Sequence, residues 1–371
     1  MELLIILHNT IKTLTARQEF FIFVPMKDFI IVGGGLAGIS FAETCLLNKK
    51  EFVLITETSG SATTVAGGVY NPVILKRLNL PMDAAAHMQF IMPFYRDIEQ
   101  RLGVSFMHDI PVYRKFASVE EQNNWFQAAD KPALEPFLDI DVKHTTYNGL
   151  PAPYGFGRVI GTGYMDTALF LKEYYNFLAE QSRLLIEAFK YSELQVNTDS
   201  VSYKGFEVRH IVFAEGFGLK NNPYFNHLPL NGTKGELLLI KAPGLKLDVI
   251  AKGNVFIIPL ANDIYKVGAT YEWEDKTTLP TEKARAELIE KLEELINCPY
   301  EIIGQTAGIR PTVTDRKPLV GTHQKYSNLH LLNGLGTRGV MLGPPMAKHL
   351  FDSIEDGIPV PKEVNLNRFK V

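Results

Sequence analysis

The stretch KDFIIVGGGLAGISFAE, residues 27–43, decides the fold of the chain. Its FIIV segment is an uninterrupted apolar run, as expected for a parallel strand that is buried on both faces. Three glycines follow at the spacing G-x-G-x-x-G: Gly33 permits a tight turn, Gly35 lets a pyrophosphate approach the backbone, and Gly38 lets the next helix pack closely on the strand. The stretch therefore predicts a strand, a turn and a helix that bind a dinucleotide.

The residues around these glycines strengthen this interpretation. Leu36 and Ala37 open the expected helix, where backbone N–H groups can donate to phosphate oxygens. The next apolar run, EFVLITE, ends in Glu57, about 20 residues after the last glycine, where a carboxylate can accept hydrogen bonds from ribose hydroxyls. An ordinary glycine-rich turn is the alternative interpretation. The order of strand, helix and acid favours the nucleotide.

The composition is typical of a globular protein. The chain has 371 residues, enough for two domains, of which 46% are hydrophobic and 21% charged. The net charge of −3 gives no overall basic field, so nucleic acid is not favoured as a partner. Cys45 and Cys298 have no metal-like spacing, and the nine histidines form no HxxxH or HExxH pair. We therefore expect neither a metal site nor a disulfide framework.

Residues 1–25 precede the expected first strand. Their apolar start is short, with no basic region and no small-residue cleavage site, so it is a poor signal peptide. Neither apolar run is long enough to span a bilayer, and we expect no transmembrane segment and a cytoplasmic location. The sequence MKDFIIVGGG favours Met26 as the biological start. An appended surface helix is the alternative.

The rest of the chain alternates between two patterns. The glycine-rich stretch TSGSATTVAGGVYNP suits a loop against a flat cofactor, and a helix followed by a buried strand recurs in TALFLKEYYNFLAEQ and LLIEAF. Between about 235 and 273, the consecutive strands ELLLIKAP, NVFIIPL and IYKVGATYEW indicate an antiparallel sheet. The predicted fold class is α/β: a doubly wound, Rossmann-like nucleotide-binding domain with an interleaved α+β substrate domain built on an antiparallel sheet.

Two late segments, AGIRPTVTDRKPLVG and NLHLLNGLGTRGVMLGPPMAKHLFDSI, identify the kind of nucleotide enzyme. The second is again a strand, a glycine turn and a helix. Together with GGGLAG, AGGVYNP, VFAEG and VGATY, they resemble the D-amino-acid oxidase family of FAD enzymes over roughly residues 27–371. This family includes glycine and sarcosine oxidases and the oxidoreductase domain of the bifunctional tRNA wobble-uridine modification enzyme. Several spaced motifs in one order are far more specific than any one of them.

The resemblance implies a discontinuous FAD-binding domain. We expect it to comprise residues 26–80, 155–230 and 305–371, with residues 81–154 and 231–304 forming the substrate domain. The C-terminal motif region contains no cysteine at which a sarcosine oxidase would attach its flavin. We therefore expect FAD to be held non-covalently.

The resemblance also adds candidate cofactor contacts in three segments: Ala66, Gly67 and Gly68; Gly216; and Gly334, Gly336, Thr337, Arg338 and Gly339. In this family the last glycine turn faces the pyrimidine edge of the flavin, where the helix N-terminus supplies a positive dipole. Arg338 would add a positive charge there. A solvated surface charge is the alternative for this residue.

Arg310 is the strongest candidate for substrate binding. It lies in the G-[IL]-R-P context of the family's carboxylate-binding arginine, and a guanidinium can hold a carboxylate with two hydrogen bonds. An interdomain salt bridge is the alternative. The resemblance implies that Phe256 and Tyr271 occupy positions at the substrate pocket, where glycine oxidases can have tyrosine and methionine respectively; at the position of Tyr271 the tRNA-modifying domain has tyrosine. Each could equally be a core aromatic residue.

The expected chemistry is oxidation of a C–N bond. A neutral amine would place its Cα–H near flavin N5 for hydride transfer, a reaction that needs no strong protein base. The first hypothesis is a small-molecule oxidase or dehydrogenase acting on an amino acid or an N-substituted glycine. The alternative is an oxidoreductase that modifies the carboxymethylaminomethyl group of a tRNA wobble uridine. A third, weaker option is an FAD-binding protein without redox turnover.

Overall fold

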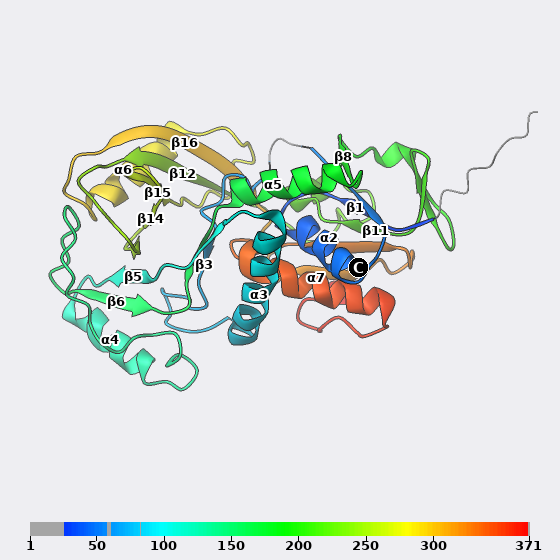
Figure 1. Ribbon diagram of the computed structural model, residues 1–371. Helices are drawn as coiled ribbons and strands as arrows, with labels where there is room; N and C mark the ends of the chain where they lie inside the picture. Colours follow the sequence, from blue (N-terminus) through cyan, green and yellow to red (C-terminus); the bar gives the residue numbers. More distant parts are fainter. Residues whose placement is uncertain (1–25, 58–60, 82, 370–371) are drawn as a thin grey trace, which may run out of the picture.

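The computed structural model describes residues 26–57, 61–81 and 83–369, and its strands form two large sheets and one small one (Figure 1). The first sheet has the order β17 (Leu319–Thr322), β18 (Leu329–Asn333), β11 (Phe206–Phe213), β1 (Lys27–Val32), β2 (Phe52–Thr56) and β8 (Leu184–Ile186), and β9 (Leu194–Val196) and β10 (Val201–Tyr203) join it through β11. From β18 to β8 these strands are parallel. The proposed start of the protein at Met26 concerns residues 1–25, which lie outside the described residues.

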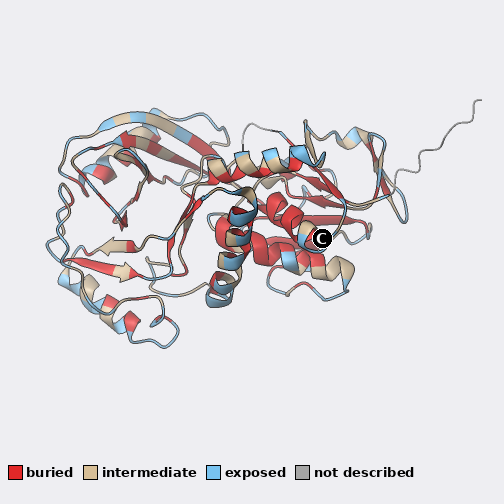
Figure 2. Cartoon of the chain, in the orientation of Figure 1, coloured by how far each residue is buried: buried red, intermediate tan, exposed pale blue. Residues whose placement is uncertain are grey.

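Both faces of this sheet are covered. The helices on one face are α2 (Leu36–Leu47), α3 (Ala84–Leu102), α5 (Thr167–Glu180) and α7 (Gly339–Glu355). Along β1, Phe29 and Ile31 pack toward these helices, whereas Ile30 and Val32 belong to the cluster on the other face. Figure 2 shows that the strands of this sheet and most of α2 and α7 are buried. Among the described helices, none has the length and apolar character needed to cross a membrane.

The second sheet has seven strands and lies at the left of Figure 1. Its order is β16 (Glu301–Arg310), β12 (Thr233–Lys241), β15 (Ile264–Gly268), β14 (Phe256–Pro259), β13 (Ile250–Lys252), β5 (Val112–Lys115) and β6 (Phe156–Val159). All neighbours are antiparallel except β13 and β5. α6 (Glu282–Glu293) packs on one face, and α4 (Val119–Ala129) packs near β5 and β6. The expected α/β fold with an antiparallel second sheet is confirmed.

The division into two domains stays a proposal, and two elements fall on the other side of the proposed boundaries. β6 lies within range 155–230 but pairs with β5 in the seven-stranded sheet. α3 lies within range 81–154 but buries its apolar face in the same cluster as α2 and α7. A helix pattern shows which face is apolar but not which sheet it covers.

A small sheet of β3 (Val69–Tyr70), β7 (Gly163–Met165) and β4 (Met107–His108) lies between the two large sheets (Figure 1).

Helix starts follow local signals that the sequence contains. Ser118 accepts a hydrogen bond from the Glu121 N–H at α4, and Asp166 accepts one from the Leu169 N–H at α5. The Glu121 carboxylate does not return to Ser118, as in a complete capping box, but accepts from the Ala117 N–H at 2.7 Å. Local capping therefore fixes these two helix starts independently of the sheets.

A histidine pair lies between β11 and β18, with His330 buried and His210 half-buried. His330 Nε2 is 3.1 Å from His210 Nδ1, and His330 Nδ1 is 2.9 Å from Thr322 Oγ1. Burial lowers the pKa of both rings, and the proximity of His210 lowers the pKa of His330 further. Both imidazoles are therefore neutral in the folded protein at neutral pH.

We expect this pair to make folding stability fall in mild acid. The unfolded histidines titrate near 6.5, so below that pH the unfolded state binds protons that the folded pair does not. Each such group decreases the free energy of unfolding by up to about 1.4 kcal/mol per pH unit. Urea unfolding between neutral pH and mild acid measures this slope, which should be shallower in His330→Leu. An identical slope in that variant would contradict the assignment.

Candidate cofactor and substrate site

The G-x-G-x-x-G turn is built as a close contact between β1, β11 and α2. Gly33 has φ of +101°, and an added Cβ there would overlap the Ala214 carbonyl at the end of β11. A Cβ on Gly38 would overlap the Gly33 carbonyl oxygen. At Gly35, by contrast, the nearest atom to an added Cβ is Thr63 Oγ1 at 3.2 Å. The first and third glycines are therefore needed for packing, and the middle one is the open position.

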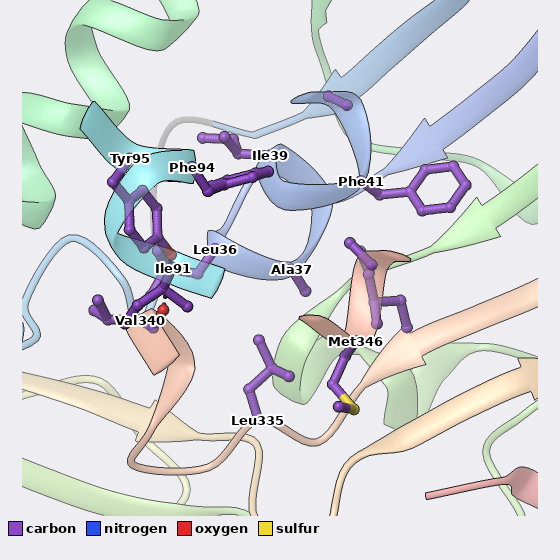
Figure 3. Close-up of a cluster of buried hydrophobic side chains, with 14 of the residues drawn as sticks. Leu36, Ala37, Ile39, Phe41, Ile91, Phe94, Tyr95, Leu335, Val340 and Met346 are labelled. Carbon is purple, nitrogen blue, oxygen red and sulfur yellow. Dashed lines mark hydrogen bonds between the residues drawn. The ribbon is translucent and has the colours of Figure 1, made fainter. Parts of the chain in front are cut away.

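The surroundings of this turn fit a dinucleotide. The N-cap of α2 is Gly35, which has no side chain to cap the helix, and the side chain of Arg338 makes no capping hydrogen bond at the N-terminus of α7. The positive dipole end of each helix favours negative or electron-rich groups of a ligand, and at α2 the Leu36 N–H donates to the Thr63 hydroxyl at 3.2 Å. Glu57 is exposed directly after β2. Figure 3 shows that Leu36 and Ala37 lie in one apolar cluster with Leu335, Val340 and Met346, so α2, α7 and the turn before α7 share a core.

A loop of small residues lies against the seven-stranded sheet. An added Cβ at Gly67 would lie 3.0 Å from Ile258 Cδ1, and one at Gly308 would lie 2.5 Å from Val65 Cγ2. Gly68 has φ of +69° and packs against the Met165 carbonyl of β7. The predicted cofactor loop therefore contacts the seven-stranded sheet and β7 of the small sheet, and its Thr63 hydroxyl accepts from the Leu36 N–H of α2 at 3.2 Å.

Lys266 on β15 contacts this loop and was not predicted. Its Nζ donates to the Ala66 carbonyl oxygen at 3.3 Å, and burial lowers its pKa. The charge of Asp166 raises the pKa of Lys266, but by less than burial lowers it. The signal in the sequence was a lysine inside the apolar strand IYKVG, although a single lysine gives no indication of which face of a sheet it occupies.

Arg310 ends β16 and turns its guanidinium over the neighbouring strand β12. An added Cβ at Gly235 would overlap all three terminal guanidinium atoms, so only glycine leaves room for this side chain. Arg310 Nη1 donates to the Thr270 carbonyl at 3.2 Å, and its Cζ lies 4.7 Å from the ring centre of Tyr271. Burial lowers the pKa of Arg310. In the described part of the chain, no carboxylate comes within 4 Å of it, which argues against the interdomain salt bridge.

The turn between β18 and α7 lies beside Arg310. The Gly336 N–H donates to the Pro311 carbonyl at 3.2 Å, and Asn333 Nδ2 donates to the Gly216 carbonyl at 2.9 Å. Two predicted cofactor segments, around Gly216 and around Gly334 to Gly339, are therefore held together. Of these predicted residues, Thr337 is exposed, and Gly339 packs against Leu36 of α2.

Arg338 and Tyr271 complete this side of the site. Burial lowers the pKa of Arg338, and the Tyr271 hydroxyl opposes this shift, as it does for Arg310. Tyr271 is 61% exposed, so it is not a core residue. The structure thus brings together Arg310, Tyr271 and Arg338 from three separate segments.

Phe256 lies farther along the same sheet, at the start of β14. It pairs with Gly268 of β15 and with Lys252 of β13. Lys252 Nζ is 4.6 Å from the centre of the Phe256 ring, and burial, together with Arg114 and Lys291, lowers its pKa to about 8. Lys252 is a second residue that was not predicted from the sequence. Its position beside Phe256 follows from the pairing of β13 with β14, which the sequence does not show.

Metal ligands do not gather around this site. Over the ranges that the structure describes, no group of three or more histidine, cysteine, aspartate or glutamate side chains could hold a metal ion. Neither cysteine is among the predicted site residues: Cys45 is buried in the second half of α2, and Cys298 packs against Gly149.

Comparison with known proteins identifies the family. The family model described as DAO, FAD dependent oxidoreductase, matches residues 28–353. A glycine oxidase from Pseudomonas aeruginosa is 25% identical over 363 residues, which cover 89% of this chain and 95% of the relative. A tRNA 5-methylaminomethyl-2-thiouridine biosynthesis bifunctional protein from Burkholderia pseudomallei is 35% identical over 321 residues, covering 80% of this chain. The match spans only 48% of that relative's length.

The fold agrees with solved structures. The crystal structure of glycine oxidase from Geobacillus kaustophilus superimposes with a TM-score of 0.69, covering 91% of this chain and 99% of the other, at 17% identity. The chain belongs to the DAO family of FAD-dependent oxidoreductases. Its cofactor is FAD, which fits the glycine turn, the N-termini of α2 and α7, whose N-cap residues make no side-chain cap, and the loop of small residues.

Proposed function

We propose that this protein oxidises the C–N bond of an amino acid or an N-substituted glycine, with its bound FAD as the hydride acceptor. The observation that carries the proposal is the environment of Arg310. Its guanidinium is part-buried and fixed by the Thr270 carbonyl and the Tyr271 ring, with no carboxylate partner among the described residues. Such a group is ready to bind the carboxylate of a substrate.

The other residues have supporting roles in this proposal. Gly33, Gly35, Leu36, Ala37, Gly38 and Glu57 would hold the ADP part of FAD, and Ala66 to Gly68, Gly216 and Gly334 to Gly339 would surround the rest. The N-terminus of α7 and Arg338 would favour negative charge on the reduced cofactor. Tyr271 and Phe256 would form walls of the substrate pocket. FAD would be held non-covalently, since the C-terminal motif region contains no cysteine to attach it.

The test is anaerobic bleaching of the purified yellow protein by a panel of amines. We expect glycine or an N-alkyl glycine to reduce the flavin and the corresponding amine without a carboxylate to fail. The carboxylate supplies the contact to Arg310 that holds the Cα–H in place. Reduction by the amines regardless of a carboxylate would contradict the proposal.

A second candidate is oxidation of a glycine-like group on a tRNA wobble uridine. It is favoured by the 35% identity to the tRNA 5-methylaminomethyl-2-thiouridine biosynthesis protein, and by Tyr271, whose position resembles that domain more than a glycine oxidase. The net charge of −3 does not favour RNA binding. Bleaching by undermodified tRNA, but not by free amino acids, would establish this candidate instead.

A further inference from the structure

Four cations line the candidate site, and none has a carboxylate within 4 Å in the described part of the chain. They are Arg310, Arg338, Lys266 and Lys252, from four different elements or turns. Each is part-buried, and burial lowers the pKa of every one. Buried charges without partners are costly, so negative groups of bound ligands are the natural counterions.

Three of these cations are explained by the proposed function. In that proposal Arg310 would bind the substrate carboxylate, Arg338 would place a positive charge at the N-terminus of α7 beside the flavin, and Lys266 contacts the cofactor loop at Ala66. Lys252 has no role in the proposed function. Its Nζ donates to the carbonyl of the adjacent Gly253 at 2.8 Å, and the charged groups that act on it are both cations, Arg114 and Lys291.

Lys252 and Arg310 lie on the same face of the seven-stranded sheet. The register aligns Leu237, Gly268, Phe256 and Lys252 across four neighbouring strands. Gly235, over which Arg310 lies, is two residues from Leu237 and therefore points to the same face. This is the face that the cofactor loop contacts through Ile258, two residues beyond Phe256.

The two cations are too far apart for one small anion. The Arg310 guanidinium lies over β12 and the Lys252 ammonium over Phe256 of β14, with β15 between them. Two strand spacings and one pleat correspond to a separation on the order of 10 Å. Each cation lies over an aromatic ring, which holds it in place without neutralising its charge.

We propose that Lys252 forms a second anion subsite in the substrate pocket, so that the substrate is an amine with two anionic groups at opposite ends. One is the carboxylate on the amine-bearing carbon, at Arg310, and the other is a carboxylate or phosphate on the substituent. This inference rests on the proposed function and narrows it to N-substituted glycines with a long anionic substituent. Arg114 next to Lys252 is already paired with Glu121, so Lys252 supplies the available charge.

The test measures binding rather than turnover. Holoprotein is titrated with straight-chain dicarboxylic acids and with monocarboxylic acids of equal length, which perturb the flavin spectrum without reducing it. We expect a long dicarboxylate to bind roughly 10-fold more tightly than its monocarboxylate, because a charged hydrogen bond is added at Lys252. Lys252→Met should abolish this ratio, and Lys252→Arg should retain most of it. An ω-phosphonate series in the same assay distinguishes a phosphate from a carboxylate as the preferred group.

The controls separate this subsite from the proposed function and from misfolding. Lys241→Met removes an exposed lysine at the opposite end of β12 and should leave the ratio unchanged. Flavin content and melting temperature are compared in all variants. A ratio near one in the wild type, or an undiminished ratio in Lys252→Met, would overturn the subsite. Loss of the affinity for monocarboxylates in Arg310→Ala tests the carboxylate anchor separately, because it does not depend on Lys252.

Discussion

Arg310→Ala is expected to slow reduction of the flavin by a carboxylate-bearing amine by roughly 30-fold or more. Truncating one partner of a buried, charge-assisted contact costs about 2–5 kcal/mol. The guanidinium is held over Gly235 with one bond to Thr270, so its remaining donors are available for two parallel bonds to a carboxylate. Stopped-flow reduction under anaerobic conditions measures the effect, as both the limiting rate and the apparent Kd.

Two comparisons make this result specific. Arg310→Lys keeps the charge but loses the planar fork, so it should recover only part of the rate. Arg285→Ala, on α6 and thus on the other face of the sheet, removes an arginine without touching the site. Each variant must carry full FAD, because a folding defect would imitate the loss. A holoprotein with Arg310→Ala that is reduced at the wild-type rate would make Arg310 a structural residue.

The parts of the fold that depend on local sequence could be predicted. Residues 27–43 contain a strand, a turn and the first two turns of a helix that ends at Leu47, and Ser118 and Asp166 cap the helices that follow them. The consecutive strands between about 235 and 273 likewise indicated an antiparallel sheet, which the structure contains as β12, β14 and β15. These features depend on residues that are close in the sequence, so they can be predicted from one sequence alone.

The site itself depends on strand register and on contacts between distant segments. Lys252 and Arg310 are separated by more than fifty residues, and only the order β16, β12, β15, β14, β13 brings them to one face. The same holds for Lys266 at the loop carbonyl of Ala66. The role of Gly235 could not be predicted from the sequence either, since the missing side chain matters only because the Arg310 guanidinium occupies that space. Pairing of distant strands is not encoded in any local pattern, and these residues were therefore missed.

The arrangement of α3 shows the same limit for a helix. The stretch MDAAAHMQFIMPFYRDIEQRLG has the pattern of an amphipathic helix, and in the structure its buried face carries Ile91, Tyr95 and Ile98. That this face packs with α2 and α7 depends on the Tyr95 hydroxyl reaching the Val340 carbonyl at 2.9 Å and on the shape of the cluster in Figure 3. The helix could be predicted, but its packing against α2 and α7 on one face of the first sheet could not.

Gly35→Val is expected to give a folded protein that is nearly colourless, with FAD affinity reduced at least about 100-fold. Gly35 has φ of −72° and ψ of −172°, a conformation that valine adopts without strain. Its nearest neighbours are two hydroxyls, Thr63 Oγ1 at 3.2 Å and Ser61 Oγ at 3.7 Å from an added Cβ. A side chain here requires the Thr63 hydroxyl to shift by a few tenths of an ångström, without the backbone overlap found at Gly33 and Gly38, whereas a pyrophosphate that approaches the backbone would meet the side chain directly.

Gly38→Ala is the control variant that distinguishes a folding defect from a loss of FAD binding. A single methyl group there would overlap the Gly33 carbonyl and separate α2 from β1, so melting temperature and flavin content should fall together. In Gly35→Val the melting temperature of the apoprotein should stay near the wild-type value while reconstitution with FAD fails, and Gly35→Ala should lie between. If Gly35→Val bound FAD as tightly as the wild type, the pyrophosphate would not lie at this turn, even though the strand, turn and helix are present.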